Sequence, residues 1–157
     1  MPDWLSHILI GLVVAELFNI DKKSLIVLGS LLPDFVVKVY LLSFLFSVND
    51  TLLFVSTLYH SPVMGLIIPG LLVPFFKYDW KKTYICITLG FMLHLLADSF
   101  TGGYGSGILL YPISYGFFSF NVFWANQYWI ILIGSIIAYA AIKIIKQKIT
   151  AKNSKDL

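Results

Sequence analysis

The sequence contains no arginine, and all eleven of its basic residues are lysines. Arginine supplies the planar, bidentate contacts by which proteins recognise nucleic-acid phosphates and bases. Its absence argues against a nucleic-acid partner. Cysteine is almost absent as well: Cys86 is the only one, so the chain can form no internal disulfide, and we expect this thiol to pack in its apolar run.

Charge is scarce along the whole chain. Only 12% of the 157 residues are charged, 59% are hydrophobic, and the mean hydropathy is +0.86. Soluble domains contain roughly 25% charged residues. The composition therefore predicts a membrane protein whose first partner is the lipid bilayer.

Five apolar runs predict the fold. Each approaches the ~20 residues that cross a ~30 Å hydrocarbon core. Pro33 interrupts the second run, and three prolines interrupt the third, so we expect both helices to be kinked around a cavity. The prediction is an all-α, polytopic membrane helix bundle of about five spans, forming one domain over 1–145 with a Lys-rich tail at 146–157. The runs cover residues 5–20, 25–46, 52–76, 84–100 and 128–145.

The lysines orient this predicted bundle. With five spans, ten of the eleven lysines fall on one side, which is cytoplasmic by the positive-inside rule. The expected location is the inner (cytoplasmic) membrane, multi-pass, with the N-terminus outside and the C-terminus in the cytoplasm. The remaining lysine, Lys38, lies within the second run.

Polar side chains recur inside the runs, where an ionised group costs ~2.5–3.5 kcal/mol on insertion scales and needs a partner. At 1.5 Å per residue, their depths overlap in the outer half of the membrane. We therefore expect metal-competent side chains from four helices to converge there. These residues are His7, Asp34, His60, His94 and Asp98.

His94 and Asp98 are the most informative pair. Positions i and i+4 share a helix face, so an imidazole and a carboxylate reach one point, as a metal ion requires. A satisfied structural pair explains the spacing equally well. The other ligands also have simpler interpretations: His7 as an interfacial anchor, His60 as a partner for a freed carbonyl, and Asp34 as a helix cap.

The motifs in which these residues occur resemble a known family. "SHILIG" near the start, "GSLLPD" at 29–34, "YHSPVMG" at 59–65 and "HLLADSFTGGYGSGILLYP" at 94–112 are similar to the successive motifs of the membrane-bound metal-dependent hydrolases. That family is also described as LexA-binding, inner-membrane-associated hydrolases. The order of ligands is distantly similar to that of zinc-dependent phospholipase C.

The resemblance implies a ligand set and a chemistry. It implies His7, Asp34, His60, His94 and Asp98 as ligands of a divalent metal, most readily Zn²⁺, with Mn²⁺ or Fe²⁺ as alternatives. No His or Glu follows Asp98, so we expect one ion or two, not three. The expected activity is hydrolysis of a lipid phosphoester.

Two residues have candidate catalytic roles in this interpretation. His7 is expected to act as a second-site ligand or as general acid/base. Lys38 is expected to stabilise a phosphoryl oxygen, although an ion pair with Asp34 or snorkelling explains it as well.

Other functions fit the same buried residues. A small metal or proton transporter also buries His and Asp at mid-depth, but it usually carries an internal repeat, and none is visible. A non-catalytic scaffold or regulatory protein needs no metal at all. A homo-oligomer is compatible with each function.

Overall fold

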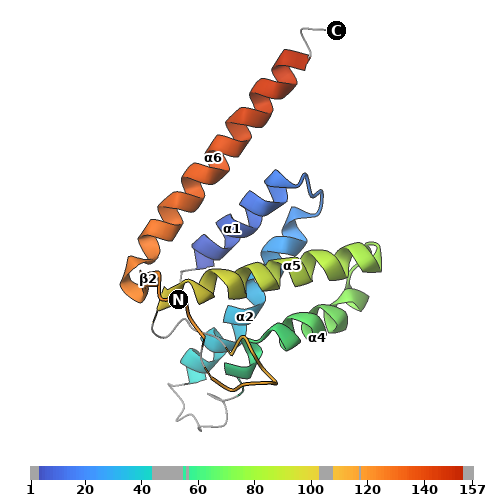
Figure 1. Ribbon diagram of the computed structural model, residues 1–157. Helices are drawn as coiled ribbons and strands as arrows, with labels where there is room; N and C mark the ends of the chain where they lie inside the picture. Colours follow the sequence, from blue (N-terminus) through green and yellow to red (C-terminus); the bar gives the residue numbers. More distant parts are fainter. Residues whose placement is uncertain (1–3, 44–54, 56, 103–107, 117, 154–157) are drawn as a thin grey trace.

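The structure is a computed structural model that describes residues 4–43, 55, 57–102, 108–116 and 118–153, excluding the side chains of 36–43, 125 and 153. The chain is mostly helical (Figure 1). Its elements are α1 (Trp4–Leu17), α2 (Lys23–Ser43), α4 (Pro62–Leu72), η2 (Val73–Phe75), α5 (Trp80–Ser99), β1 (Thr101–Gly102), β2 (Phe123–Trp124), η3 (Ala125–Gln127) and α6 (Tyr128–Asn153).

Two helices begin at side chains that cap them. The Asp79 carboxylate accepts a hydrogen bond from the backbone N–H of Lys82 at 2.9 Å and starts α5. The Ser61 hydroxyl accepts one from the N–H of Met64 at 3.4 Å, directly before Pro62 at the first turn of α4. Such caps satisfy backbone donors that have no partner within the helix.

Helices α2 and α5 cross in close contact; α1 packs against both, α4 packs against α5, and α6 packs against α1. A Cβ at Gly29 would lie 2.1 Å from the carbonyl oxygen of Ile87, and one at Gly90 would lie 2.0 Å from that of Ile26. Only glycine permits this approach, because it has no side chain to meet the facing backbone. Cys86 belongs to the same core and is buried, so its predicted packing role is confirmed.

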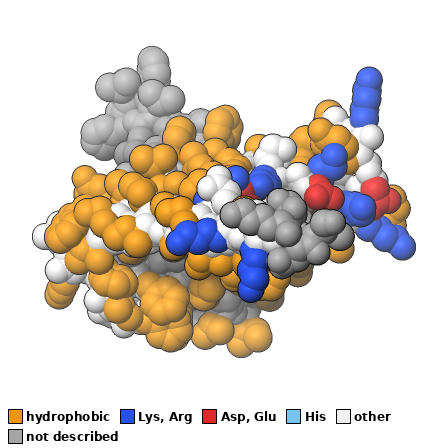
Figure 2. Space-filling model, turned by 90° about the horizontal axis from the view of Figure 1, so that it is seen from above, with side chains coloured by type: hydrophobic (Ala, Val, Ile, Leu, Met, Phe, Trp, Pro, Cys, Tyr) orange, Lys and Arg blue, Asp and Glu red, His pale blue; other side chains and the backbone are white. Residues whose placement is uncertain are grey.

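The molecule buries polar groups and exposes apolar ones. Three histidines, two aspartates and Glu16 are buried, whereas many large apolar side chains, such as Phe75 and Ile137, are exposed. Figure 2 looks at the molecule from above and shows lysine side chains on this face amid apolar surface. This distribution is the reverse of that in a water-soluble domain.

The prediction of five spans is only partly matched. Among the described residues, one helix, Tyr128–Lys152, is long and apolar enough to cross a membrane, while Trp4–Leu17 and Pro62–Phe75 are apolar but shorter. The run at 52–76 is not one helix, because the chain bends at His60 and Ser61 before α4 begins. Helix α6 also continues to Asn153, past the predicted end at 145.

The prolines act differently in the two predicted kinked helices. Pro33 lies inside α2, which is assigned as one helix through Ser43. Pro69 lies inside α4, and Pro74 lies in η2, where the α-helix has ended. Proline cannot donate the hydrogen bond that would continue a helix. The break in the third run therefore comes from the bend before Pro62 and from the end at Pro74.

A two-residue parallel β pair departs from the all-α prediction. Thr101 pairs with Phe123 and Gly102 with Trp124. Just before this pair, the N–H of Phe120 donates to the Ser99 carbonyl at 2.7 Å, and the N–H of Val122 donates to the Phe100 carbonyl at 3.0 Å. The returning chain thus satisfies carbonyls that the end of α5 leaves without partners.

Candidate metal centre

Helix α5 presents His94 and Asp98 to one point. Their spacing of four residues places both on the same face, and the Nε2 atom of His94 lies 3.1 Å from Oδ2 of Asp98. The two side chains are 1% and 2% exposed. This pair forms the base of the candidate site.

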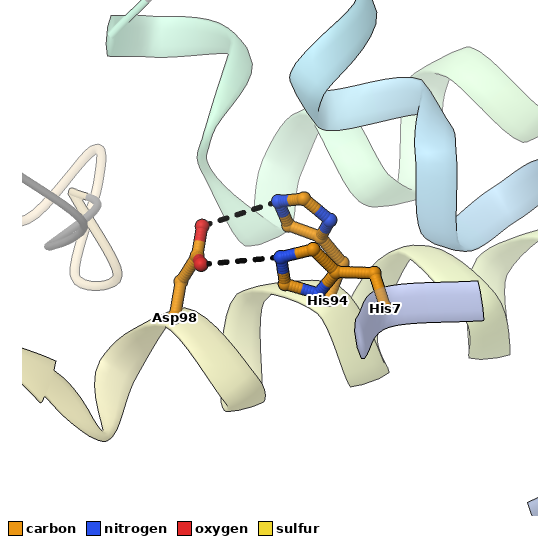
Figure 3. A group of neighbouring side chains, drawn as sticks. All are labelled: His7, His94 and Asp98. Atoms are coloured by element: carbon orange, nitrogen blue, oxygen red, sulfur yellow. Dashed lines mark ion pairs between the residues drawn. The ribbon is translucent and has the colours of Figure 1, made fainter. Parts of the chain in front are cut away.

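Helix α1 adds His7, whose ring lies beside that of His94 (Figure 3). Its Nε2 lies 3.4 Å from Oδ1 of Asp98, so the carboxylate is shared between two imidazoles (Figure 3). The rings of His7 and His94 are stacked, with centroids 3.8 Å apart and an interplanar angle of 20°. The three side chains offer ligand atoms that all lie within 4.8 Å of one another.

A second triad uses the same His94. The Oδ1 atom of Asp34, from α2, lies 3.8 Å from Nε2 of His94 and 3.7 Å from Nε2 of His60. His60 is held at the bend before Ser61, the cap of α4. These ligand atoms also lie within 4.8 Å of one another. We call the five residues of the two triads the His/Asp cluster: His7, Asp34, His60, His94 and Asp98.

The His/Asp cluster is buried, and most of its polar atoms lack hydrogen bonds. Within the described part of the chain, both carboxylate oxygens of Asp34 and Asp98, both ring nitrogens of His7 and the Nε2 atom of His94 have no hydrogen-bond partner. A buried polar atom without a partner costs about 1–3 kcal/mol, and a charged one costs more. A divalent cation would satisfy carboxylate oxygens of both aspartates and one nitrogen of each imidazole.

The remaining nitrogen of His94 is fixed by the backbone. Its Nδ1 lies 2.7 Å from the carbonyl oxygen of Ser30. A carbonyl only accepts, so Nδ1 carries the proton and donates, and the lone pair is on Nε2. This is the arrangement by which proteins orient a metal-binding imidazole. The contact depends on the close crossing of α2 and α5 at Gly29.

The donor set fits a divalent transition metal. Three imidazole nitrogens and two carboxylates match the ligands of Zn²⁺, Mn²⁺ or Fe²⁺. Two carboxylate charges also equal the charge of one such ion. The cluster therefore has the atoms, the spacing and the charge to hold a cation without any further side chain.

Two of the simpler interpretations of these residues do not fit the structure. Asp34 lies within α2 and not at a helix start, so it is not an N-terminal cap. His7 is 1% exposed, so it is not an anchor at the surface of the fold. The side chain of Lys38 lies outside the described residues, and its predicted role remains a prediction.

One polar cluster had no counterpart in the sequence analysis. Glu16, which its helical position separates from His7, is buried against Lys23, Lys143 and Lys146. Glu16 and Lys23 lie on different helices, and Lys143 and Lys146 are more than 120 positions from Glu16, so no spacing rule within one helix predicts these contacts.

Comparisons with known proteins complete the description. No curated protein and no solved structure matches the chain. A family does match, and it covers residues 1–154, nearly the whole sequence. The chain thus belongs to the YdjM inner membrane protein family, and the inner membrane is its location.

Proposed function

We propose that this inner-membrane protein is a metal-dependent hydrolase whose His/Asp cluster holds a divalent cation and cleaves a phosphoester of a lipid. The observation that carries the proposal is the meeting of two buried ligand triads at His94, with carboxylate and imidazole atoms that lack hydrogen bonds. Carboxylates that are ionised but lack hydrogen bonds in an apolar interior are costly to retain without a compensating charge.

The multi-pass arrangement is part of the proposal. Helices α2 and α5 have 21 and 20 residues, about 30 Å at 1.5 Å per residue, which is the thickness of a hydrocarbon core. Their buried Asp and His lower their hydropathy without changing their length. Exposed apolar side chains and buried polar ones support placing these helices in lipid.

A cation explains the cluster better than protons alone. Two carboxylates beside three imidazoles can be balanced by protonated histidines, but charged imidazoles stacked at 3.8 Å, as His7 and His94 are, repel each other in a medium of low dielectric constant. One dication leaves all three imidazoles neutral and both carboxylates ionised. Metal binding requires these protonation states.

The geometry of His94 limits the number of ions. Its Nε2 belongs to both triads, and one lone pair binds one ion. A single ion that takes ligands from both triads uses His94 once. A second ion would have to rely on residues other than His94, such as His7 with Asp98.

The chemistry follows from the ligand set. When bound, such an ion lowers the pKa of a coordinated water toward ~7 and polarises a phosphoryl oxygen. Asp98 orients His7 through the 3.4 Å contact, which suits His7 to move a proton as general acid/base if it is not a ligand. Asp34 and His60 close the opposite side. Apolar surroundings favour a lipid over a water-soluble substrate.

Lipid turnover tests this function. Detergent-purified protein, supplied with Zn²⁺ or Mn²⁺, is assayed against a panel of phospholipids and lipid phosphates for release of a phosphorylated head group or of phosphate. We expect Asp98→Asn to lower turnover by more than about 100-fold, because even outer-shell changes at metal sites cost 10–100-fold.

A matched control lies on the same helix. Thr83 is fully buried in α5, eleven positions before His94, so Thr83→Val should keep both fold and activity. Equal turnover by Asp98→Asn and wild type, or metal-independent turnover, would contradict the proposal. Metal or proton flux across liposomes without hydrolysis would instead identify a transporter.

A further inference from the structure

A second charged cluster lies at the other end of α1. Glu16 is 5% exposed, and its Oε1 lies 2.5 Å from Nζ of Lys23 and 3.0 Å from Nζ of Lys143. The Nζ atom of Lys146 lies 3.9 Å from Oε2 of Glu16, and it also donates to the backbone carbonyl of Glu16 and to Oδ1 of Asn19. We call Glu16, Lys23, Lys143 and Lys146 the lysine cluster. It joins α1, α2 and α6.

The lysine cluster has more positive charge than its own carboxylate neutralises. Three ammonium groups face one carboxylate, so two positive charges are in excess. The side chains of Lys23, Lys143 and Lys146 are 39%, 45% and 33% exposed, which leaves each ammonium open to another anion.

A groove opens beside this excess charge. It has a volume of about 440 Å³, within the range of roughly 300–1,000 Å³ that is usual for small-molecule sites. Its lining also includes the Gln147 amide, whereas the Thr150 hydroxyl already donates to the Lys146 carbonyl at 3.0 Å. Ammonium and amide donors around one groove suit the oxygens of a phosphate group.

The surface next to the groove is apolar. On α6, Ile144, Ile137 and Ile133 share a helix face next to that of Gln147 and are 52%, 63% and 49% exposed. Helix α6 runs alongside α1 at this level and extends beyond the rest of the fold (Figure 1). A ligand with a phosphate in the groove can therefore lay a hydrocarbon chain along α6.

From this combination we infer that the groove between α1 and α6 binds the phosphate-bearing head group of an anionic phospholipid, with its acyl chains against α6. Basic residues at the cytoplasmic surface of a membrane attract such lipids by about 1 kcal/mol each. The inferred site does not depend on the His/Asp cluster, which lies toward the opposite end of α1, nor on whether that cluster holds a metal.

Lipid binding to the full chain tests the inference. Delipidated, detergent-solubilised protein is titrated with phosphatidylglycerol or with phosphatidylcholine of the same acyl chains, and bound lipid is counted by native mass spectrometry. We expect phosphatidylglycerol to bind in preference. The double variant Lys143→Gln/Lys146→Gln should weaken its binding by roughly 30-fold, from two lost lysine contributions.

Two further variants separate binding from structure. Lys77→Gln/Lys81→Gln removes two exposed lysines elsewhere and should leave the affinity within twofold of wild type. Glu16→Gln keeps all three lysines and removes the competing carboxylate, so it should tighten binding of phosphatidylglycerol. A weaker affinity in Glu16→Gln would mean that the lysines serve only to hold Glu16, and the inference would be wrong.

The ligand source is tested by competition. Inorganic phosphate alone should displace the lipid only at concentrations far above that of the lipid, because it lacks the contacts with α6. Displacement at matched concentration would assign the groove to free phosphate and overturn the lipid assignment. Equal binding of phosphatidylcholine and phosphatidylglycerol, or equal losses in the two lysine double variants, would overturn it as well.

Discussion

At the scale of single residues, His94 is the centre of the candidate site. Its Nδ1 is fixed by the Ser30 carbonyl at 2.7 Å, and its Nε2 approaches both aspartates, Asp98 at 3.1 Å and Asp34 at 3.8 Å. No other residue of the His/Asp cluster belongs to both triads. Its side chain therefore decides whether the two triads act as one site.

This position predicts an order among histidine variants. His94→Ala removes a ligand from both triads and should abolish metal binding, whereas His7→Ala and His60→Ala each remove a ligand from one triad and should weaken it. Competition with a chromophoric chelator measures the three affinities. Equal losses of metal affinity in all three variants would mean that His94 is not a ligand shared by the two triads.

At the scale of elements, the crossing of α2 and α5 sets the distance between the ligands of the two helices. Gly90→Ala would place a Cβ 2.0 Å from the Ile26 carbonyl oxygen, so the helices must separate or the chain must unfold. We expect a loss of about 2–4 kcal/mol in the free energy of unfolding, typical of overpacking against backbone, together with loss of metal binding.

Gly134 provides the matched control for this variant. It also lies in a helix, α6, but a Cβ there would meet no described atom within 4 Å. Gly134→Ala should therefore stabilise the protein by up to about 1 kcal/mol through helix propensity. Thermal or denaturant unfolding in detergent measures both. If Gly90→Ala were as stable as Gly134→Ala, the close crossing would be wrong.

The elements also show what the sequence could predict. The α5 helix and the burial of Cys86 follow from the apolar run at 84–100, and the shared face of His94 and Asp98 follows from the rule that residues four apart lie on one face. The sequence predicts that the third run is interrupted at its prolines, but the chain bends at His60 and Ser61 instead. Pro62 lies in the first turn of α4, where proline starts a helix and does not interrupt it.

The lysine cluster and the β pair, which the sequence did not predict, both depend on contacts between distant segments. The lysine cluster depends on how α6 packs against α1, which brings Lys143 to Glu16, and no spacing rule reports such a contact. The β pair of Thr101 with Phe123 depends on a returning chain. The cost of burying charge predicted that the five residues of the His/Asp cluster lie together, but it named no partner for Glu16.

At the scale of the whole molecule, the proposed topology can be tested by labelling. On a Cys86→Ser background, single cysteines are placed at Ile113, Tyr78 and Thr150, which are exposed. An impermeant maleimide should label the cysteine at 113 in intact spheroplasts, and the other two only after lysis, because five spans place 113 outside.

Other labelling patterns would revise the arrangement. If the cysteines at 78 and 113 lay on one side and the cysteine at 150 on the other, the chain after residue 78 would cross the membrane with α6 alone, as its length and apolarity already permit. If the cysteines at 78 and 150 lay on opposite sides of the membrane, the number of spans between them would be odd, and the proposed orientation of α5 or α6 would be incorrect.

The central claim is that the buried His/Asp cluster holds a cation. The most direct test is the metal content of detergent-purified protein by elemental analysis, after loading with Zn²⁺ or Mn²⁺ and removal of unbound ion. We predict at least one ion per wild-type and Thr83→Val chain and none in His94→Ala. A wild-type protein without stoichiometric metal under every loading condition, or an equal content in His94→Ala, would contradict the account.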